Sequence, residues 1–280
     1  MTAVLLAAAS AALFGAMTVA LRLALLRNPD ARVGAAVTAL AAFAVAFAAT
    51  PLGSSDADAG DLAVFALIGA LAPGGSQLLF TLAVRDAGAA RTSVVVGAAP
   101  LLTVVLGLAL LDEPFEIALV AGAALIVSGG TALVWERLRP ATFRAIGMLY
   151  AVGCTALFAS RDTFVRWFSG ETPVASTGAA AATLLGGAVV LSIVAARGRW
   201  RHFLPFVPVG ILFGLSYVCL FEAFYRGRVT VVSPLVATET LWGVGLSALL
   251  IGRGERVGRR LVLGALLIVA GAALIGARSS

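Results

Sequence analysis

The chain has 280 residues, of which 61% are hydrophobic and only 12% are charged, with a formal net charge of +6. A soluble domain carries roughly 25% charged residues, so this composition places the chain in a lipid bilayer. All 20 basic residues are arginines. The absence of lysine excludes a phosphate-binding loop of the G-x-x-x-x-G-K type and a lysine Schiff base. We therefore expect neither an ATP-driven pump nor a retinal protein.

Ten apolar runs follow one another along the chain, and each is long enough to cross the hydrocarbon core as a helix of about 20 residues. We predict spans at residues 3–26, 33–52, 62–84, 92–111, 115–135, 145–168, 174–196, 203–225, 229–251 and 260–277. A β-barrel is excluded because its strands alternate in polarity over about ten residues. The connections are too short for a folded soluble domain, so we expect function to reside within the bundle. We expect no cleavable signal peptide, because no basic region precedes the first run.

Other residue types exclude further functions. The arginines are scattered over short connections, which argues against nucleic-acid binding despite the positive net charge. Cys154 and Cys219 lie inside apolar runs and are expected to be packing residues and not a disulfide. His202 is the only histidine, and no H-E-x-x-H zinc motif is present. We therefore expect no metal, no cofactor and no enzymatic activity.

The sequence repeats itself after about half its length. The first-half residues Ala12-Leu13-Phe14 and Arg22 recur 144 positions later, as Ala156-Leu157-Phe158 and Arg166. Near the end of each half, Glu113, Gly122 and Gly129 recur 142 positions later, as Glu255, Gly264 and Gly271. Because each half holds five spans, an odd number, the second half must enter the membrane upside down, as in inverted-repeat transporters. We predict an all-α integral membrane protein with ten transmembrane helices in two inverted five-helix repeats, residues 1–140 and 141–280.

These motifs resemble a known family. Phe14-Gly15 followed by Arg22 resembles the first-span signature of the EamA family of the drug/metabolite transporter superfamily, with Phe14 in place of its Trp. A second resemblance lies in the fourth and fifth spans, where the family has a proline, a leucine-rich run, a glutamate and two glycines. This chain has Pro100, a run that ends in Leu111-Asp112-Glu113, and then Gly122 and Gly129. The second half departs from this pattern because it has Glu239-Thr240 in the neighbourhood where the first half has the proline. The resemblance covers nearly the whole chain and implies a ten-helix carrier of small organic metabolites, such as an amino-acid exporter.

Four ionisable residues lie deep within predicted spans, where a charge costs roughly 2.5–3.5 kcal/mol. They are Glu239, Glu222, Arg161 and Asp162. They could form a midplane site for a charged substrate or a coupling proton, or a purely structural ion pair such as Arg161 with Glu239. Adjacent helical residues point about 100° apart, so we expect only one of Arg161 and Asp162 to face the cavity centre, and Asp162 could instead pair with Arg166. Arg22 and Arg166, near span ends, are expected to reach the headgroups.

Neutral polar and aromatic residues supply further candidates. Ser76 and Gln77 follow Pro73-Gly74-Gly75, which loosens the helix, so backbone carbonyls there could line a cavity, or the kink could serve packing. Trp242 lies three residues after Glu239 and could stack a substrate or pack the core. The remaining candidates are Pro100, Thr103 and Tyr217, together with Phe14 and Phe158, which could be gates or core residues. Gly210-x-x-x-Gly214 and the repeated glycines indicate close helix packing.

The leading hypothesis is a secondary active transporter, a monomer or homodimer, that exports an amino acid or similar zwitterion by alternating access. Arg161 would bind the carboxylate, and Glu239 or Glu222 the ammonium or a coupling proton. The alternative is a flippase for a lipid-linked or phosphate-bearing headgroup, with Arg161 as the anion contact. In the connections and at the span ends next to them, 14 arginines fall on one side and 4 on the other, which leaves out Arg22 and Arg161. The positive-inside rule thus places the termini outside a prokaryotic cytoplasmic membrane, whereas the resemblance implies termini inside.

Overall fold

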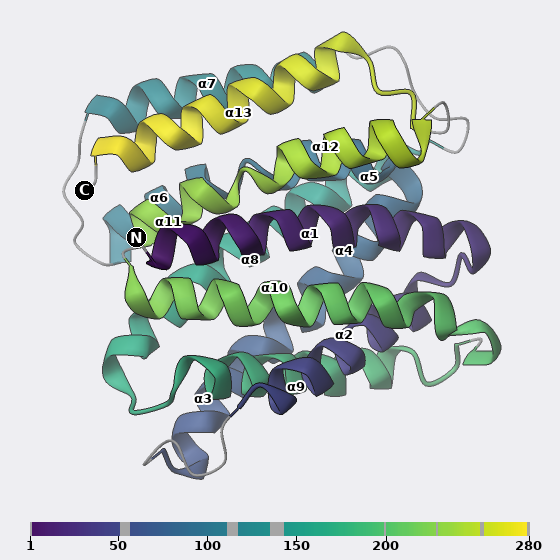
Figure 1. Cartoon of the computed structure of the whole chain (residues 1–280), viewed down its shortest axis with the longest axis vertical. Helices are drawn as coiled ribbons and strands as arrows, with labels where there is room; N and C mark the ends of the chain where they lie inside the picture. Colours follow the sequence, from purple (N-terminus) through teal and green to yellow (C-terminus); the bar gives the residue numbers. More distant parts are fainter. Residues whose placement is uncertain are drawn as a thin grey trace.

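The structure is a computed structural model that describes residues 2–50, 57–110, 117–134, 143–198, 200–227, 229–252 and 255–278. The described residues form α-helices and two short 3-10 helices and contain no strand, which confirms the prediction of an all-helical chain (Figure 1). The helices of the first half are α1 (Thr2–Arg27), α2 (Ala31–Ala48), α3 (Ala59–Leu71), α4 (Gly74–Ala87), α5 (Ala89–Val96), α6 (Ala99–Leu110) and α7 (Ile117–Val134). Those of the second half are α8 (Ile146–Glu171), α9 (Ser176–Val194), η1 (Trp200–His202), η2 (Leu204–Phe206), α10 (Val207–Arg226), α11 (Val229–Val236), α12 (Glu239–Leu250) and α13 (Arg259–Arg278).

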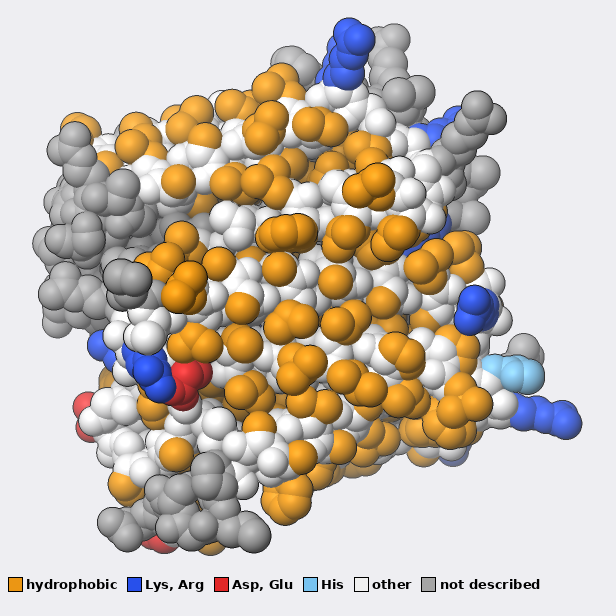
Figure 2. All heavy atoms as spheres, in the orientation of Figure 1, with side chains coloured by type: hydrophobic (Ala, Val, Ile, Leu, Met, Phe, Trp, Pro, Cys, Tyr) orange, Lys and Arg blue, Asp and Glu red, His pale blue; other side chains and the backbone are white. Residues whose placement is uncertain are grey.

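Apolar side chains cover the outside of the bundle. Leu67, Ile193 and Leu249 are each more than two-thirds exposed, and Figure 2 shows hydrophobic side chains over most of one face, with charged ones along its edges. Such a surface suits lipid and not water. Five stretches among the described residues are long and apolar enough to span a bilayer, namely Thr2–Arg27, Ala31–Ala48, Ala59–Ala87, Ser176–Val194 and Leu204–Arg226.

Three of the predicted spans are interrupted. The third breaks between α3 and α4 at Ala72, which is extended (φ −145°, ψ 104°), because the following Pro73 disfavours a helical residue before it. The fourth breaks between α5 and α6, and the ninth between α11 and α12. Glu113 and parts of spans two, four and five, at residues 51–52, 111, 115–116 and 135, lie outside the described residues.

The helices of the two halves correspond closely in position and length. Helix α8 begins 144 residues after α1 (146 against 2), and each has 26 residues. Helices α11 and α12 begin 140 residues after α5 and α6, with lengths of 8 and 12 residues in both halves. The fourth and ninth spans are therefore interrupted at equivalent points. The halves differ in the third span, which is divided into α3 and α4 in the first half, whereas α10 is continuous.

Contacts between the halves come in matched pairs. Helix α1 packs on α10 as α8 packs on α4, and α2 packs on α10 as α9 packs on α3. Helices α7 and α13 pack on each other, and their repeated glycines lie where the two helices touch. A Cβ added to Gly129 would lie 2.6 Å from the carbonyl oxygen of Gly264, and one added to Gly271 would lie 2.6 Å from that of Gly122. The first glycine of each half thus meets the second glycine of the other.

Glycines also set the approach of α10 to α2. A Cβ at Gly210 would lie 2.6 Å from the carbonyl oxygen of Thr38, and one at Gly214 would lie 2.7 Å from that of Ala42. The two helix backbones can therefore touch only because these positions lack a side chain, as the Gly-x-x-x-Gly spacing predicts. The start of α1 and the end of α13 lie at the same end of the bundle, on the left in Figure 1.

Candidate functional site

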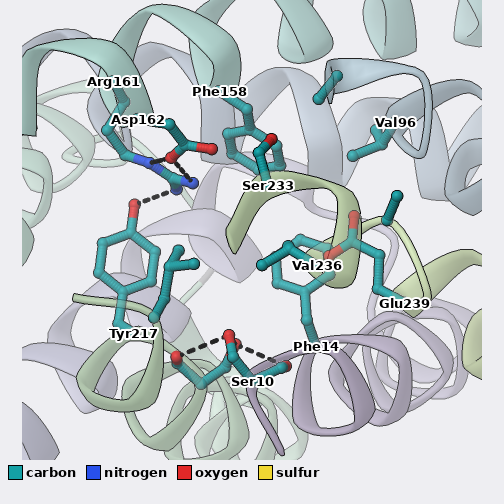
Figure 3. A pocket seen from close by; sticks show the side chains of 14 residues that line it. Ser10, Phe14, Val96, Phe158, Arg161, Asp162, Tyr217, Ser233, Val236 and Glu239 are labelled. Carbon is teal, nitrogen blue, oxygen red and sulfur yellow. Dashed lines mark hydrogen bonds and ion pairs between the residues drawn. The ribbon is translucent and has the colours of Figure 1, made fainter. Parts of the chain in front are cut away.

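A cavity of about 30 Å³ lies within the bundle, which is room for a few water molecules (Figure 3). Its walls come from α1, α8 and α10 and from the interrupted fourth and ninth spans. The lining residues are Ser10, Phe14, Val96, Ala99, Phe158, Arg161, Asp162, Ser216, Tyr217, Leu220, Ser233, Val236, Ala237 and Glu239.

Both equivalent interruptions border the cavity. Val96 and Ala99 flank the break between α5 and α6, and Val236, Ala237 and Glu239 flank the break between α11 and α12. At each break the backbone turns on bonds within the span, such as Ala98 N to Val95 O and Thr238 N to Leu235 O, each 3.1 Å. Irregular backbone is tolerated at membrane depth only where it is buried in protein or lines a cavity. Transporter sites are commonly built at such discontinuous helices, where two repeats meet. The two breaks are therefore the feature of the fold that positions this site.

Arg161 and Asp162 bind each other at one side of the cavity. Arg161 Nη2 lies 2.6 Å and Nε 2.8 Å from the same Asp162 oxygen, Oδ1. Both side chains line the cavity, so the expectation that only one of them faces it is wrong. The alternative pairing of Asp162 with Arg166 is also wrong, because the long side chain of the adjacent Arg161 occupies the Asp162 carboxylate.

The third contact of Arg161 is with Tyr217 of α10. Arg161 Nη1 donates a hydrogen bond of 2.7 Å to the Tyr217 hydroxyl. The guanidinium carbon lies 4.7 Å from the ring centroid of Phe158 and 5.0 Å from that of Tyr217, both within the range of cation–π attraction. Tyr217 thus lines the cavity as predicted and holds the guanidinium in place.

Glu239 lies on the other side of the cavity, as the first residue of α12 (Figure 3). Glu239 is only 6% exposed. Among the described residues, no hydrogen bond or ion pair is made by its carboxylate, and the hypothetical ion pair with Arg161 is not formed. Glu239 is therefore a buried acidic side chain that faces the cavity without a bonded partner.

Aromatic rings form part of the cavity wall. Phe14 of α1 and Phe158 of α8, which are equivalent in the two halves, meet edge to face with ring centroids 5.8 Å apart. Phe80 of α4 packs against Phe14 at 5.2 Å. Phe14 and Phe158 thus combine a core position with a cavity position, and their role as gates stays a prediction.

Two stretches of the chain, residues 1–135 and 145–277, match the model of the EamA-like transporter family. The chain belongs to this family. It is accordingly a multi-pass membrane protein of the drug/metabolite transporter superfamily, whose members move small molecules. One solved structure, described only as a crystal structure of a protein, superposes with a TM-score of 0.64 at 22% identity, over 95% of this chain and 96% of that one. At this identity the likeness shows the fold alone. No curated protein matches the chain.

Sequence reasoning about this EamA chain missed the serines of the cavity. Ser10 of α1 and Ser216 of α10 lie with their Oγ atoms 3.0 Å apart. Each hydroxyl also lies 3.0 Å from the other residue's carbonyl oxygen. Ser233 of α11 lines the cavity as well. Single serines in apolar helices are common, so nothing in their spacing distinguishes these three.

Two predicted site residues lie away from the cavity. The Glu222 carboxylate accepts a 2.7 Å hydrogen bond from Nε of Arg226, one turn later at the end of α10, and also contacts the Ser176 hydroxyl. Glu222 therefore does not line the cavity, because its carboxylate pairs with Arg226 near the end of the helix. Trp242 is 49% exposed on the outside of the bundle. A spacing of three residues leaves a helix angle of about 60° from Glu239, enough to direct the ring away from the cavity.

Ser76, Gln77 and Thr103 do not line the cavity either. Ser76 and Gln77 are fully buried in α4, and their side-chain polar atoms have no hydrogen-bond partner in the part of the chain that the structure describes. The Thr103 hydroxyl donates to the carbonyl oxygen of Ala99 at 3.1 Å, which satisfies it within its own helix. Pro100 lies in the first turn of α6 beside the break, and its side chain lies outside the described part of the chain.

Arg22 also departs from the prediction. It is 5% exposed and does not reach toward the headgroups. Its Nε lies 2.9 Å from Oε1 of Glu255, and its Nη1 donates to the carbonyl oxygen of Arg85 at 2.9 Å. Gly88, at φ +95°, faces the same carboxylate, and any side chain there would collide with Glu255. These contacts tie α1 and the α4–α5 junction to the connection before α13, away from the cavity.

Proposed function

We propose that this EamA-family protein is a secondary active transporter that exports a small organic metabolite bearing an amino group, of which amino acids and similar zwitterions are the first candidates. The observation that carries the proposal is the cavity at the two equivalent helix breaks, with the unpaired carboxylate of Glu239 on one side and Arg161 on the other. No phosphate-binding loop is present in the sequence, so the energy would come from a solute or ion gradient.

In this proposal the cavity residues have separate roles. Glu239 binds the substrate ammonium or, between substrates, a coupling proton. Where the substrate is a zwitterion, Arg161 is the contact for its carboxylate and shares its guanidinium between that group and Asp162. Tyr217 holds the guanidinium by the 2.7 Å hydrogen bond. The rings of Phe14 and Phe158 pack against the apolar part of the substrate. This division of roles gives one oppositely charged partner to each end of a zwitterion.

Alternating access is the transport mechanism that the repeat supports. The two halves, residues 1–140 and 141–280, would be inverted repeats that contribute five spans each, with the cavity at their interface. A cavity of about 30 Å³ holds only a few waters, so binding an amino acid requires the helices around the breaks to move apart. Such rocking of one repeat against the other would open the site first to one side and then to the other.

The alternative, a flippase for a phosphate-bearing headgroup, has less support. It requires a cation that is free to contact the anion, and Arg161 is the cation of this cavity. Its Nε and Nη2 bind Asp162 and its Nη1 binds Tyr217. A headgroup phosphate brings only negative charge, so it would compete with Asp162 for the guanidinium and would add to the charge of Glu239. A ligand that also carries a positive group fits the site better.

We also propose that the protein resides in a prokaryotic cytoplasmic membrane with both termini outside. The basis is the distribution of arginines in the connections and at the span ends next to them, with 14 on one side and 4 on the other. Arg91 belongs to the larger group but is buried and donates to the carbonyl oxygen of Glu255 at 2.9 Å. The asymmetry remains large without it.

Ligand-dependent stabilisation of the purified protein tests the proposed function. A metabolite present at a free concentration 100 times its dissociation constant should add about 2.7 kcal/mol to the free energy of unfolding. We expect stabilisation by one or more amino compounds from a metabolite panel, and loss of that stabilisation in Glu239→Gln. Compounds that stabilise the protein should also be taken up by proteoliposomes. A panel in which only phosphate-bearing lipids stabilise the wild type would favour the flippase instead.

A further inference from the structure

The charges in the cavity do not balance. Three charged side chains line it, Arg161, Asp162 and Glu239. Arg161 and Asp162 neutralise each other through a buried ion pair of 2.6 Å, with side chains 4% and 6% exposed. Glu239 has no such partner among the described residues. When all three are ionised, the empty cavity therefore has one uncompensated negative charge, which a ligand with one net positive charge would cancel.

Arg161 is poorly prepared to receive a substrate carboxylate. Each of its three nitrogens makes a hydrogen bond inside the protein, Nε and Nη2 with Asp162 and Nη1 with Tyr217. The rings of Phe158 and Tyr217 lie 4.7 and 5.0 Å from the guanidinium carbon. An incoming carboxylate would meet only the second N–H groups of Nη1 and Nη2, and it would compete with Asp162 for a guanidinium whose charge that acid already neutralises. Weakening the buried ion pair in this way is unfavourable.

An ammonium group meets the opposite situation at Glu239. The carboxylate is buried, borders the cavity and has its acceptor positions open. An ammonium can pair with it without breaking any bond seen in the structure, and charge-assisted hydrogen bonds of this kind are the strong ones. The ring of Phe14 lines the same wall and offers the ammonium an aromatic neighbour.

From this charge count we propose that the site prefers an organic ammonium cation without a carboxylate over the corresponding zwitterionic amino acid. The inference rests on the proposed function and narrows its substrate class to amines. Asp162 then acts as an internal carboxylate that occupies Arg161 and so excludes acids from the site.

Three compounds with the same branched carbon chain test this preference. Isopentylamine carries only the ammonium, leucine carries both groups, and 4-methylpentanoate carries only the carboxylate. Isothermal titration calorimetry with the full-length purified protein at neutral pH should show isopentylamine binding about tenfold more tightly than leucine, and no measurable binding of 4-methylpentanoate.

Asp162→Asn provides the diagnostic variant, because it frees Arg161 and brings the cavity charge to zero. We expect it to bind leucine about tenfold more tightly than the wild type and to lose the preference for isopentylamine. Glu222→Gln is the matched control, since it removes a carboxylate of α10 outside the cavity, and it should leave the order of the three compounds unchanged. If Asp162→Asn does not fold, Glu239→Gln serves instead and should lose isopentylamine binding.

Tighter binding of leucine than of isopentylamine by the wild type would overturn this inference and leave the transporter proposal intact. Binding of none of the three would also overturn it, while the wider metabolite panel would still decide the proposed function. An unchanged order in Asp162→Asn would show that Asp162 does not exclude the carboxylate.

Discussion

Arg22 and Glu255 lie 233 positions apart in the chain and form a buried ion pair, with Nε 2.9 Å from Oε1 and side chains 6% and 0% exposed. The pair joins the first helix to the connection before the last one. A backbone N–H also faces this carboxylate, since Ala90 N lies 3.4 Å from Oε2. One acid thus fixes three distant segments of the chain at one end of the bundle.

Glu255→Gln should destabilise the protein by about 3–5 kcal/mol, because it leaves the Arg22 guanidinium buried without a counter-charge. Denaturant unfolding in detergent measures this loss. The matched control is Arg226→Gln, which breaks the pair with Glu222 where the side chains are 51% and 24% exposed. A pair of that exposure contributes at most about 1 kcal/mol. Equal losses in the two variants would show that the Arg22–Glu255 pair has no special structural role.

The crossing of α7 and α13 depends on the absence of side chains. Gly271→Val should destabilise the protein by about 1–3 kcal/mol through overpacking, because its Cβ would lie 2.6 Å from the carbonyl oxygen of Gly122. Gly245→Ala in α12 is the control, since a Cβ there meets no atom of the described residues within 4 Å. It should be neutral or stabilise by up to about 1 kcal/mol. A tolerated Gly271→Val would mean that the two helices are not held this closely.

Helix positions and the repeat could be predicted because both depend on local, periodic features of the sequence. Long apolar runs indicate helices whatever their partners, and the recurrence of Phe14 as Phe158 predicts that the two rings occupy equivalent places. The structure adds that the rings meet at the cavity, 5.8 Å apart. Glu239 and Arg161 could be selected because an ionisable group inside an apolar run is costly wherever it points.

Pairings between side chains could not be predicted from the sequence. Helical spacing gives the direction of a Cα–Cβ bond but not the path of a long side chain, so it missed the contact of Arg161 with the adjacent Asp162. Position along a predicted span also failed to predict burial near the helix ends. Arg22 turns inward to Glu255, and Glu222 turns outward to Arg226. Ser10 and Ser216 became recognisable only when the packing of α1 on α10 brought them together.

The orientation proposal predicts the location of the C-terminus. Alkaline phosphatase, which is active only outside the cytoplasm, should be active when fused after Ser280 in a bacterial host. A green fluorescent protein fused at the same position should stay dark, because it does not mature after export by this route. A bright fusion together with an inactive phosphatase would place both termini in the cytoplasm, and the arginine distribution would then need another explanation.

The central claim is that Glu239 is the cavity group that couples substrate binding to transport. The most direct measurement is gradient-driven uptake by reconstituted proteoliposomes, with a substrate identified from the panel, for wild type, Glu239→Gln and Glu222→Gln. Glutamine keeps the size and hydrogen bonding of glutamate and removes the charge, so both variants should fold and insert. We predict that Glu239→Gln loses gradient-coupled uptake while Glu222→Gln, changed outside the cavity, transports at the wild-type rate. Wild-type uptake by Glu239→Gln, with the same pH dependence, would contradict the account and reduce Glu239 to a structural residue.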